Sequence, residues 1–462
     1  MGIVFLPLKS GAQEFPVTTT TNATTLGGVA FDGYNYLFGF VEDSVNNVTA
    51  QFVSSSGALV GSKISVGYIG GAPLVAFDGT KYLLLWSSPK QLFNPDKSII
   101  DSVHGQFVST SGTLIGSRFL VAANATISSP KGGCLEYNNG LYMVIYKQND
   151  INYAVTINPS GTISTPVQLS TQLIGDNAIA FDGTNYLVAW WTHGINHYGY
   201  EQDIYGQFIS STGSLVGQNF LIDDDNLASD NPLSIAFDGT NYMVTYHAQV
   251  SGGGEWNLYS RFVSTSAVVD NKICLRDSTY SPSFGYSSFD GTNYLVTWAD
   301  NAFSLQSVIR GRYYNTQGVP IDSMFTIFTS LNGDIPVFAG HFFTNNKFLV
   351  VTFRMDTSNF TYGDIYGAFI PSSTSSLTPI RTGEEIYTIY PNPASDKVNI
   401  VITNNKIYKS LNIYNILGRR VITQSINQDK TQVDVSGLST GVYFIQLSDG
   451  NNNKTHKLVI KR

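Results

Sequence analysis

The stretch FDGTNYLV at residues 181–188 decides the fold, because it recurs along the chain. An Asp-Gly pair between two apolar runs is a strong signal for a tight β-hairpin, since both residues tolerate positive φ. Five clear copies begin at Phe31, Phe77, Phe181, Phe237 and Phe289, and weaker copies begin at Tyr137 and Phe343. Repetition at a period of about 50 residues is typical of a repeat architecture, here with seven units.

Each copy continues into a second phrase, clearest at residues 203–222 as DIYGQFISSTGSLVGQNFLI. The two phrases together predict four strands per copy, joined as an antiparallel meander. In the fourth copy these strands are residues 178–181, 186–190, 204–210 and 215–222.

The second strand of the copies is apolar on both faces. In the fourth copy Tyr186 and Trp190 share one face, and Leu187 and Ala189 share the other. A sheet buried on both faces needs neighbours on both sides, which radially arranged blades supply. We therefore predict an all-β fold: a seven-bladed β-propeller with four-stranded antiparallel blades.

The two ends of the repeat region complement each other. The seventh copy offers three strands before the composition changes after residue 370, whereas residues 14–20 precede the first copy like an unpaired fourth strand. We expect the N-terminal strand to complete the last blade, because closure removes the open edges of the array.

A small residue occupies one fixed place on the third strand of every copy. We expect it to leave room for an aromatic ring from the adjacent sheet, as a packing device. The seven residues are Ala50, Gly105, Ala154, Gly206, Ser260, Gly311 and Gly367.

Beyond residue 370 a Ser/Thr/Pro-rich linker precedes a new set of alternating strands. Four motifs follow in order: YPNPASDKVNI at 390–400, NILGRRV at 415–421, LSTGVYFIQL at 438–447 and the basic end KLVIKR at 457–462. They resemble the type A C-terminal sorting domain of the type IX secretion system of Bacteroidetes. The motif residues are Tyr390, Pro391, Asn392, Pro393, Gly418, Gly441, Tyr443 and Lys457.

The resemblance implies export by a signal peptide and then by the type IX secretion machinery, to a secreted or surface-attached location. MGIVFLPLKSGA at residues 1–12 resembles the back half of a signal peptide without its basic region, the alternative being an ordinary frayed terminus. The expected division is a signal-peptide remnant at 1–12, the propeller at 13–370, a linker at 371–388 and the sorting domain, an Ig-like β-sandwich, at 389–462.

Composition excludes several classes of function. The formal charge is −7, and no run of Lys or Arg interleaves with aromatics, which argues against nucleic acid. No apolar stretch approaches the roughly 20 residues of a membrane-spanning helix. The two cysteines, Cys134 and Cys274, are expected to be small buried hydrophobes. The sequence also has no GxSxG elbow and no HExxH.

We expect no metal and no cofactor. His193, His197 and Glu201 are four residues apart, but a glycine-containing loop does not provide the helical spacing of a zinc site. The aspartates at 223–225 and 230 lack the glycine-turned spacing of a calcium loop, so a solvated crossover is expected there.

The loops between the second and third strands vary widely, and variable loops on a rigid scaffold are the usual address of function. Those of the fourth and fifth copies carry exposed aromatic and histidine side chains suited to stacking on sugar rings or capturing a peptide. The alternative is that they cap the end of the blades. These candidate binding residues are Trp191, His193, His197, Tyr198, Tyr200, His247 and Trp256.

A glycan-cleaving enzyme would need carboxylates that converge on the central channel. We assign no catalytic residue from the sequence. Acids that lie in these loops are Glu42, Asp43, Asp150, Glu201, Glu255, Asp300 and Asp356.

We therefore expect an exported binding scaffold for carbohydrate or for a protein partner. The alternative is an extracellular glycan-degrading hydrolase or lyase that uses loop carboxylates. A pocket holding carboxylates with separated pKa values would favour the enzyme, whereas an open aromatic patch would favour binding.

Overall fold

The structure is a computed structural model of the chain, which forms two compact units, Met1–Ser376 and Leu377–Arg462. The described residues are 14–18, 24–42, 47–69, 71–88, 102–127, 134–170, 174–192, 194–196, 199–201, 203–224, 234–249, 256–277, 282–302, 304–330, 334–336, 340–356, 361–373, 387–390, 394–402, 409–415, 419–426, 428, 430–448 and 453–461. The predicted signal-peptide remnant at 1–12 lies outside them.

The first six repeat copies each form a four-stranded antiparallel sheet in chain order. The first three sheets are β2 (Thr24–Phe31), β3 (Asn35–Glu42), β4 (Asn47–Ser54) and β5 (Leu59–Ile69); β6 (Leu74–Phe77), β7 (Lys81–Ser88), β8 (Ser102–Ser109) and β9 (Leu114–Ala123); and β10 (Leu135–Asn138), β11 (Leu141–Gln148), β12 (Ile151–Ile157) and β13 (Val167–Gln168).

The next three sheets follow the same order. They are β14 (Ile174–Phe181), β15 (Asn185–Thr192), β18 (Ile204–Ser210) and β19 (Leu215–Asp223); β20 (Ser234–Phe237), β21 (Asn241–Gln249), β22 (Trp256–Ser264) and β23 (Ile273–Arg276); and β24 (Ser283–Phe289), β25 (Tyr294–Asp300), β26 (Val308–Tyr314) and β27 (Phe325–Thr329). A separate hairpin of β16 (Gly194–Asn196) and β17 (Gly199–Glu201) interrupts the fourth copy.

The N-terminal strand completes the sheet of the seventh copy. That sheet contains β28 (Asp334–Pro336), β29 (Gly340–Thr344), β30 (Lys347–Asp356), β31 (Thr361–Pro371) and β1 (Glu14–Pro16). Phe15 of β1 stands opposite Gly367 of β31 in an antiparallel pair. Val17 N donates to Ile365 O at 2.8 Å and continues the connection. The prediction that an N-terminal strand completes the last sheet is confirmed for residues 14–18.

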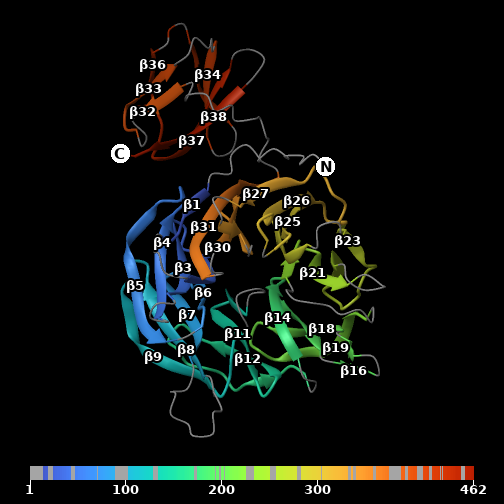
Figure 1. Cartoon of the computed structure of the whole chain (residues 1–462). Coiled ribbons are helices and arrows are strands. Elements are labelled where there is room, and N and C mark those ends of the chain that lie inside the picture. Colours follow the sequence, from blue (N-terminus) through green and yellow to red (C-terminus); the bar gives the residue numbers. More distant parts are fainter. Residues whose placement is uncertain are drawn as a thin grey trace. The chain divides into compact units, whose positions relative to one another are not determined.

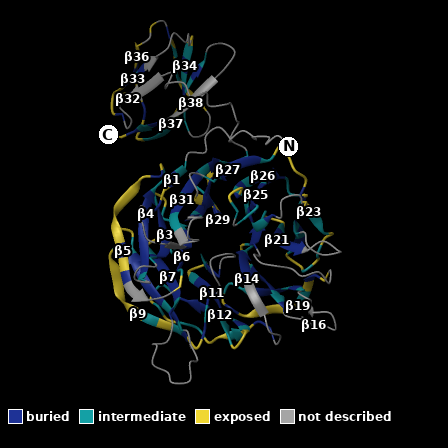
Figure 2. Cartoon of the chain, viewed as in Figure 1, coloured by how far each residue is buried: buried dark blue, intermediate teal, exposed yellow. Residues whose placement is uncertain are grey.

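The sheets surround a common centre, with their first strands innermost (Figure 1). Each innermost strand contacts the next, and β2 also contacts β31 of the last sheet. Residues on both faces of the second strands are buried, as Tyr186, Leu187 and Ala189 show with at most 1% exposure. Exposure concentrates on outer strands such as β5 and β9 (Figure 2). Burial on both faces therefore follows from neighbouring sheets, as predicted.

The small residues of the third strands accommodate a ring from their own sheet. Gly206 stands opposite Phe220 of β19, and a Cβ on Gly206 would lie 2.7 Å from Phe220 Cζ. Gly367 faces Phe15 in the same way. The prediction of a ring from the adjacent sheet is wrong for these glycines, because the outermost strand of the same sheet brings its phenylalanine directly opposite.

The C-terminal unit contains two antiparallel sheets around one apolar core. One sheet is β32 (Tyr387–Tyr390), β33 (Lys397–Ile402) and β36 (Lys430–Asp434), and the other is β35 (Arg420–Ser425), β34 (Ser410–Asn415), β37 (Gly441–Ser448) and β38 (Asn453–Ile460). Buried residues of both sheets, including Val398, Leu411 and Ile445, form the core.

Most sorting-motif side chains lie outside the described region. Tyr390 ends β32 and Lys457 lies on β38, but only their backbone is described. Gly441 begins β37, and the Tyr443 hydroxyl donates to Ser439 O at 3.1 Å. Pro391, Asn392, Pro393 and Gly418 lie outside the described residues.

Candidate functional site

A cavity of about 500 Å³ lies among the innermost strands of the first unit. It is lined by residues of β2, β6, β10, β14, β20, β24 and β29, so every repeat copy contributes to its wall. The wall is mostly apolar, with aliphatic and aromatic side chains, and carries a few polar groups. Ligand sites of proteins usually have such walls and volumes of roughly 300–1,000 Å³.

Glu136 on β10 is the one carboxylate among the described residues that line this cavity. The equivalent residue is a small apolar one in four other copies: Ala30, Ala76, Ala180 and Ala236. The fold is therefore built with a methyl group at this place, and packing alone does not require an acid. Glu136 is accordingly a candidate for chemistry.

The surroundings of Glu136 keep its carboxyl group protonated at neutral pH. Burial in the cavity wall raises its pKa to about 8, although a hydrogen bond from Asn138 partly opposes the shift. Asn138 Nδ2 donates to Glu136 Oε2 at 3.3 Å. A carboxyl group with its pKa near the working pH is suited to general acid catalysis.

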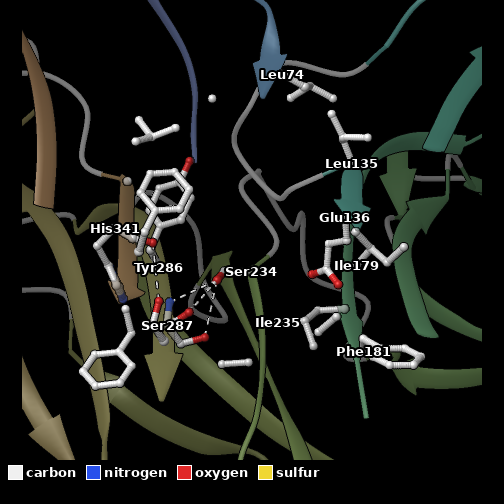
Figure 3. A pocket seen from close by; sticks show the side chains of 18 of the residues that line it. Leu74, Leu135, Glu136, Ile179, Phe181, Ser234, Ile235, Tyr286, Ser287 and His341 are labelled. Atoms are coloured by element: carbon white, nitrogen blue, oxygen red, sulfur yellow. Dashed lines mark hydrogen bonds between the residues drawn. The ribbon is translucent and has the colours of Figure 1, made fainter. Parts of the chain in front are cut away.

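Polar side chains from β20, β24 and β29 lie across the cavity from Glu136 (Figure 3). Ser287 N donates to Ser234 Oγ at 3.0 Å, which fixes two hydroxyl-bearing residues side by side. His341 is 6% exposed, and its Nδ1 lies 2.9 Å from Thr297 Oγ1. Burial lowers the pKa of His341 to about 3, so the ring is neutral. This side of the cavity offers neutral hydrogen-bonding groups opposite a proton donor.

The predicted binding residues lie away from this cavity where they are described. Trp191 is half-buried near the end of β15 and packs against the apolar core between the fourth and fifth sheets. Trp256 begins β22 and is also half-buried. His247 is only 3% exposed, because β21 extends through it to Gln249, so its expected exposed loop position is wrong.

The other predicted binding residues are described little or not at all. Tyr200 is described only by its backbone on β17, and His193, His197 and Tyr198 lie outside the described residues. The structure therefore describes the side chains of only Trp191, His247 and Trp256 among the seven, and the binding role of the set remains a prediction.

The predicted loop acids whose side chains the structure describes, Glu42, Asp150 and Asp300, are not among the residues that line the cavity. Asp300 is buried on β25, where Trp298 Nε1 donates to Oδ1 at 2.8 Å and Arg310 Nε donates to Oδ2 at 2.9 Å. Glu42 forms an ion pair with Lys63, and Asp150 Oδ1 lies 3.8 Å from Lys147 Nζ. Glu201 lies on β17 and Asp356 ends β30, whereas Asp43 and Glu255 lie outside the described residues.

Asp223 and the two cysteines differ in part from what the sequence predicts. Asp223 is 6% exposed and not solvated, because two cations of the next copy donate to its carboxylate. Arg261 Nε donates to Oδ1 at 2.7 Å and Lys272 Nζ donates to Oδ2 at 3.2 Å. Cys274 is exposed, contrary to expectation, and Cys134 is buried, with its thiol donating to Asn177 Oδ1 at 2.9 Å.

Residues 388–461 match the family described as the secretion system C-terminal sorting domain. The chain therefore carries a type IX sorting domain, and the protein is secreted or attached to the cell surface. In the part of the chain that the structure describes, no helix has the length and apolar character needed to cross a membrane.

Among curated proteins, the chain is similar to an endo-acting ulvan lyase of Formosa agariphila, with 43% identity over 74 residues, 16% of this chain and 14% of that protein. It is also similar to beta-agarase A of Zobellia galactanivorans, with 31% identity over 83 residues, 18% of this chain and 14% of that protein. The chain thus spans only about a seventh of the length of these two relatives.

Among solved structures, the chain is similar to the polysaccharide lyase Uly1, with a TM-score of 0.50. The match covers 78% of this chain and 99% of that chain at 9% sequence identity. At this identity the likeness concerns the fold alone, which is an all-β arrangement of antiparallel sheets.

Proposed function

We propose that this exported protein is an extracellular polysaccharide-cleaving enzyme in which Glu136 donates a proton to the departing glycosidic oxygen. The observation that carries the proposal is a protonated carboxyl group in the central cavity, at a place where four other copies of the repeat have alanine. Two relatives that cleave polysaccharides, and a lyase with a similar fold, support this choice of substrate class.

We also infer that the seven sheets are the blades of a closed seven-bladed propeller at residues 13–370. A linker at 371–388 and an Ig-like sandwich at 389–462 follow in this proposal. The pairing of β1 with β31 and the contacts between successive innermost strands support the closed ring. The two sheets around one core support the sandwich.

In hydrolysis the bond between the anomeric carbon and the leaving oxygen breaks, water adds its hydroxyl group to the carbon, and the other proton of the water replaces the one that the acid gave to the leaving oxygen. In elimination by a lyase, the sugar ring instead loses a carbon-bound proton and forms a double bond as the same oxygen departs. In both reactions a positioned acid protonates the leaving oxygen and contributes roughly 10²–10⁴-fold to the rate. Glu136 holds that proton at neutral pH because burial disfavours its ionised form. The serine hydroxyls across the cavity are suited to hydrogen bonding with sugar hydroxyls, which would orient the bond toward the acid.

The test is incubation of the full chain with a panel of polysaccharides that includes ulvan and agarose. New reducing ends together with the ultraviolet absorbance of an unsaturated sugar would identify a lyase, and reducing ends alone a hydrolase. Binding without product would contradict the enzyme proposal. It would favour a binding scaffold that holds polysaccharide through Trp191 and Trp256.

Deleting residues 389–462 is expected to stop secretion and to leave the protein in the periplasm. The reason is that the sorting domain addresses the chain to the outer-membrane step, whereas the first unit has its own core. Immunoblotting of periplasmic and culture fractions measures the effect, with full-length Glu136→Gln as the control that should still be exported. Unchanged secretion of the truncated chain would overturn the sorting role.

A further inference from the structure

The third repeat copy departs from five of the other copies at a second place, two residues after Glu136. Five other copies have an aspartate there that accepts the two backbone N–H groups of the hairpin turn. Asp182, for example, accepts from Thr184 N at 2.7 Å and from Asn185 N at 2.6 Å. The third copy has Asn138 instead.

The turn of the third copy is closed by different means. Asn139 and Gly140 both have positive φ, 51° and 82°, which is the conformation of a two-residue hairpin turn of type I′. In the fourth copy only Gly183 of the corresponding pair has positive φ. The third turn is thus specified by Asn-Gly, and the side chain at position 138 can serve another purpose.

Asn138 directs its amide to Glu136, with 3.3 Å between Nδ2 and Oε2. An amide N–H can only donate, so Oε2 acts as the acceptor and the proton of the neutral carboxyl group is left to Oε1. The donated bond also opposes the rise in the pKa of Glu136, because it favours the ionised form.

An aspartate at position 138 would have the opposite effect. It would place a second carboxylate within hydrogen-bonding distance of Glu136, and two such groups share one proton and raise one of their pKa values. In the fourth and fifth copies, the aspartates lie instead beside a tyrosine of the next sheet, as Asp182 does beside Tyr242. The corresponding tyrosine of the fourth sheet, Tyr186, lies beside Asn138.

We infer that Asn138 is a positioning residue that fixes the carboxyl group of Glu136 and prevents it from sharing its proton with a second acid. The inference rests on the proposed function, because it takes Glu136 as the proton donor. The third copy thus differs from most of the others at two neighbouring places that act together. Glu136 replaces alanine and carries the proton, and Asn138 replaces aspartate and holds the carboxyl group of Glu136.

The decisive variant is Asn138→Asp, which restores the residue of five other copies and is therefore compatible with the fold. The titration of Glu136 is followed by ¹³C NMR of side-chain carboxyl groups, with Glu136→Gln for assignment. In this variant the two carboxyl groups at positions 136 and 138 share a proton. We expect the higher of their two pKa values to exceed that of Glu136 in the wild type by about one unit or more, because a negative charge at this distance disfavours a second one. Asn138→Ala, which removes the donor without adding charge, should raise it by less.

In Asn138→Asp, the alkaline limb of the pH profile of kcat/KM should move to higher pH together with the NMR titration. A residue with a merely structural role would not cause this shift. A Glu136 titration that is unchanged in both Asn138 variants would overturn the inference, whether or not the enzyme cleaves polysaccharide. A shifted titration in a protein that cleaves no polysaccharide would support the positioning role and contradict the proposed function. The two failures are therefore distinguishable.

Discussion

Replacing Glu136 with glutamine is expected to lower kcat on a cleaved polysaccharide by roughly 10²–10⁴-fold, the usual contribution of a general acid. The amide has the shape of the carboxyl group and can still accept the hydrogen bond from Asn138, but it has no acidic proton to transfer. KM should therefore change little. Initial rates across a pH series measure both parameters.

Asp150→Asn is the matched control, because it makes the same chemical change at an exposed turn outside the cavity wall. Its kcat should equal that of the wild type. Equal loss of activity in both variants, or full activity in Glu136→Gln, would show that the cavity acid is not the proton donor.

Glu136→Gln should also change the pH dependence of stability. The pKa of Glu136 is raised from 4.5 to about 8 in the folded protein, so the stability contributed by the protonated form is complete below pH 4.5 and is lost as the pH rises to about 8. We expect this loss to be about 2–3 kcal/mol, which is less than the full shift in pKa would give, because the side chain is only half-buried and solvent screens it. The variant should lack this loss.

Urea denaturation at about pH 5 and pH 9 measures this difference between the two proteins, because most of the loss falls between pH 4.5 and 8. The pKa of His341 is lowered to about 3, so its stabilising effect is lost as the pH falls below 6.5. This loss is the same in both proteins and cancels from the difference between them. Parallel pH dependences of wild type and variant would contradict a raised pKa at Glu136.

The strands and the closing segment could be predicted because their signals are local. The DGTN turns fix the hairpins, and period-two patterns fix which face of a strand a side chain occupies. A pattern does not say which neighbour fills the space beside that face. For this reason the pattern predicts a ring from another sheet opposite Gly206, whereas the ring comes from Phe220 on the same sheet.

The candidate site could not be predicted in the same way, although one signal was present. The variable loops predict a site at the strand ends, but there Asp300 is hydrogen-bonded to Arg310 and His247 is buried on a strand. Comparison of the copies position by position would have singled out Glu136, which stands where four of them have alanine. Its position across a cavity from His341, some 200 residues later, depends on how the sheets are arranged around the centre.

Replacing Phe15 with alanine is expected to lower the free energy of unfolding by about 3–5 kcal/mol, the range for truncating a buried phenylalanine. The ring is 8% exposed, covers Gly367 and stacks on Phe369 with 5.0 Å between centroids. It anchors a strand of only three residues, so its loss should also detach β1 from β31 and open the ring of sheets. Urea denaturation measures the loss.

Phe119→Ala is the matched control, because Phe119 covers Gly105 in the second sheet as Phe15 covers Gly367 in the last. Phe119 lies within a ten-residue strand that stays attached by its other hydrogen bonds, so its truncation should leave the closure intact. Hydrogen exchange of the Val17 amide, which donates to Ile365 O, reports the closure directly. Exchange that accelerates in Phe15→Ala but not in Phe119→Ala would support an N-terminal closing strand, whereas equal exchange in the two variants would mean that β1 contributes packing without closing the ring.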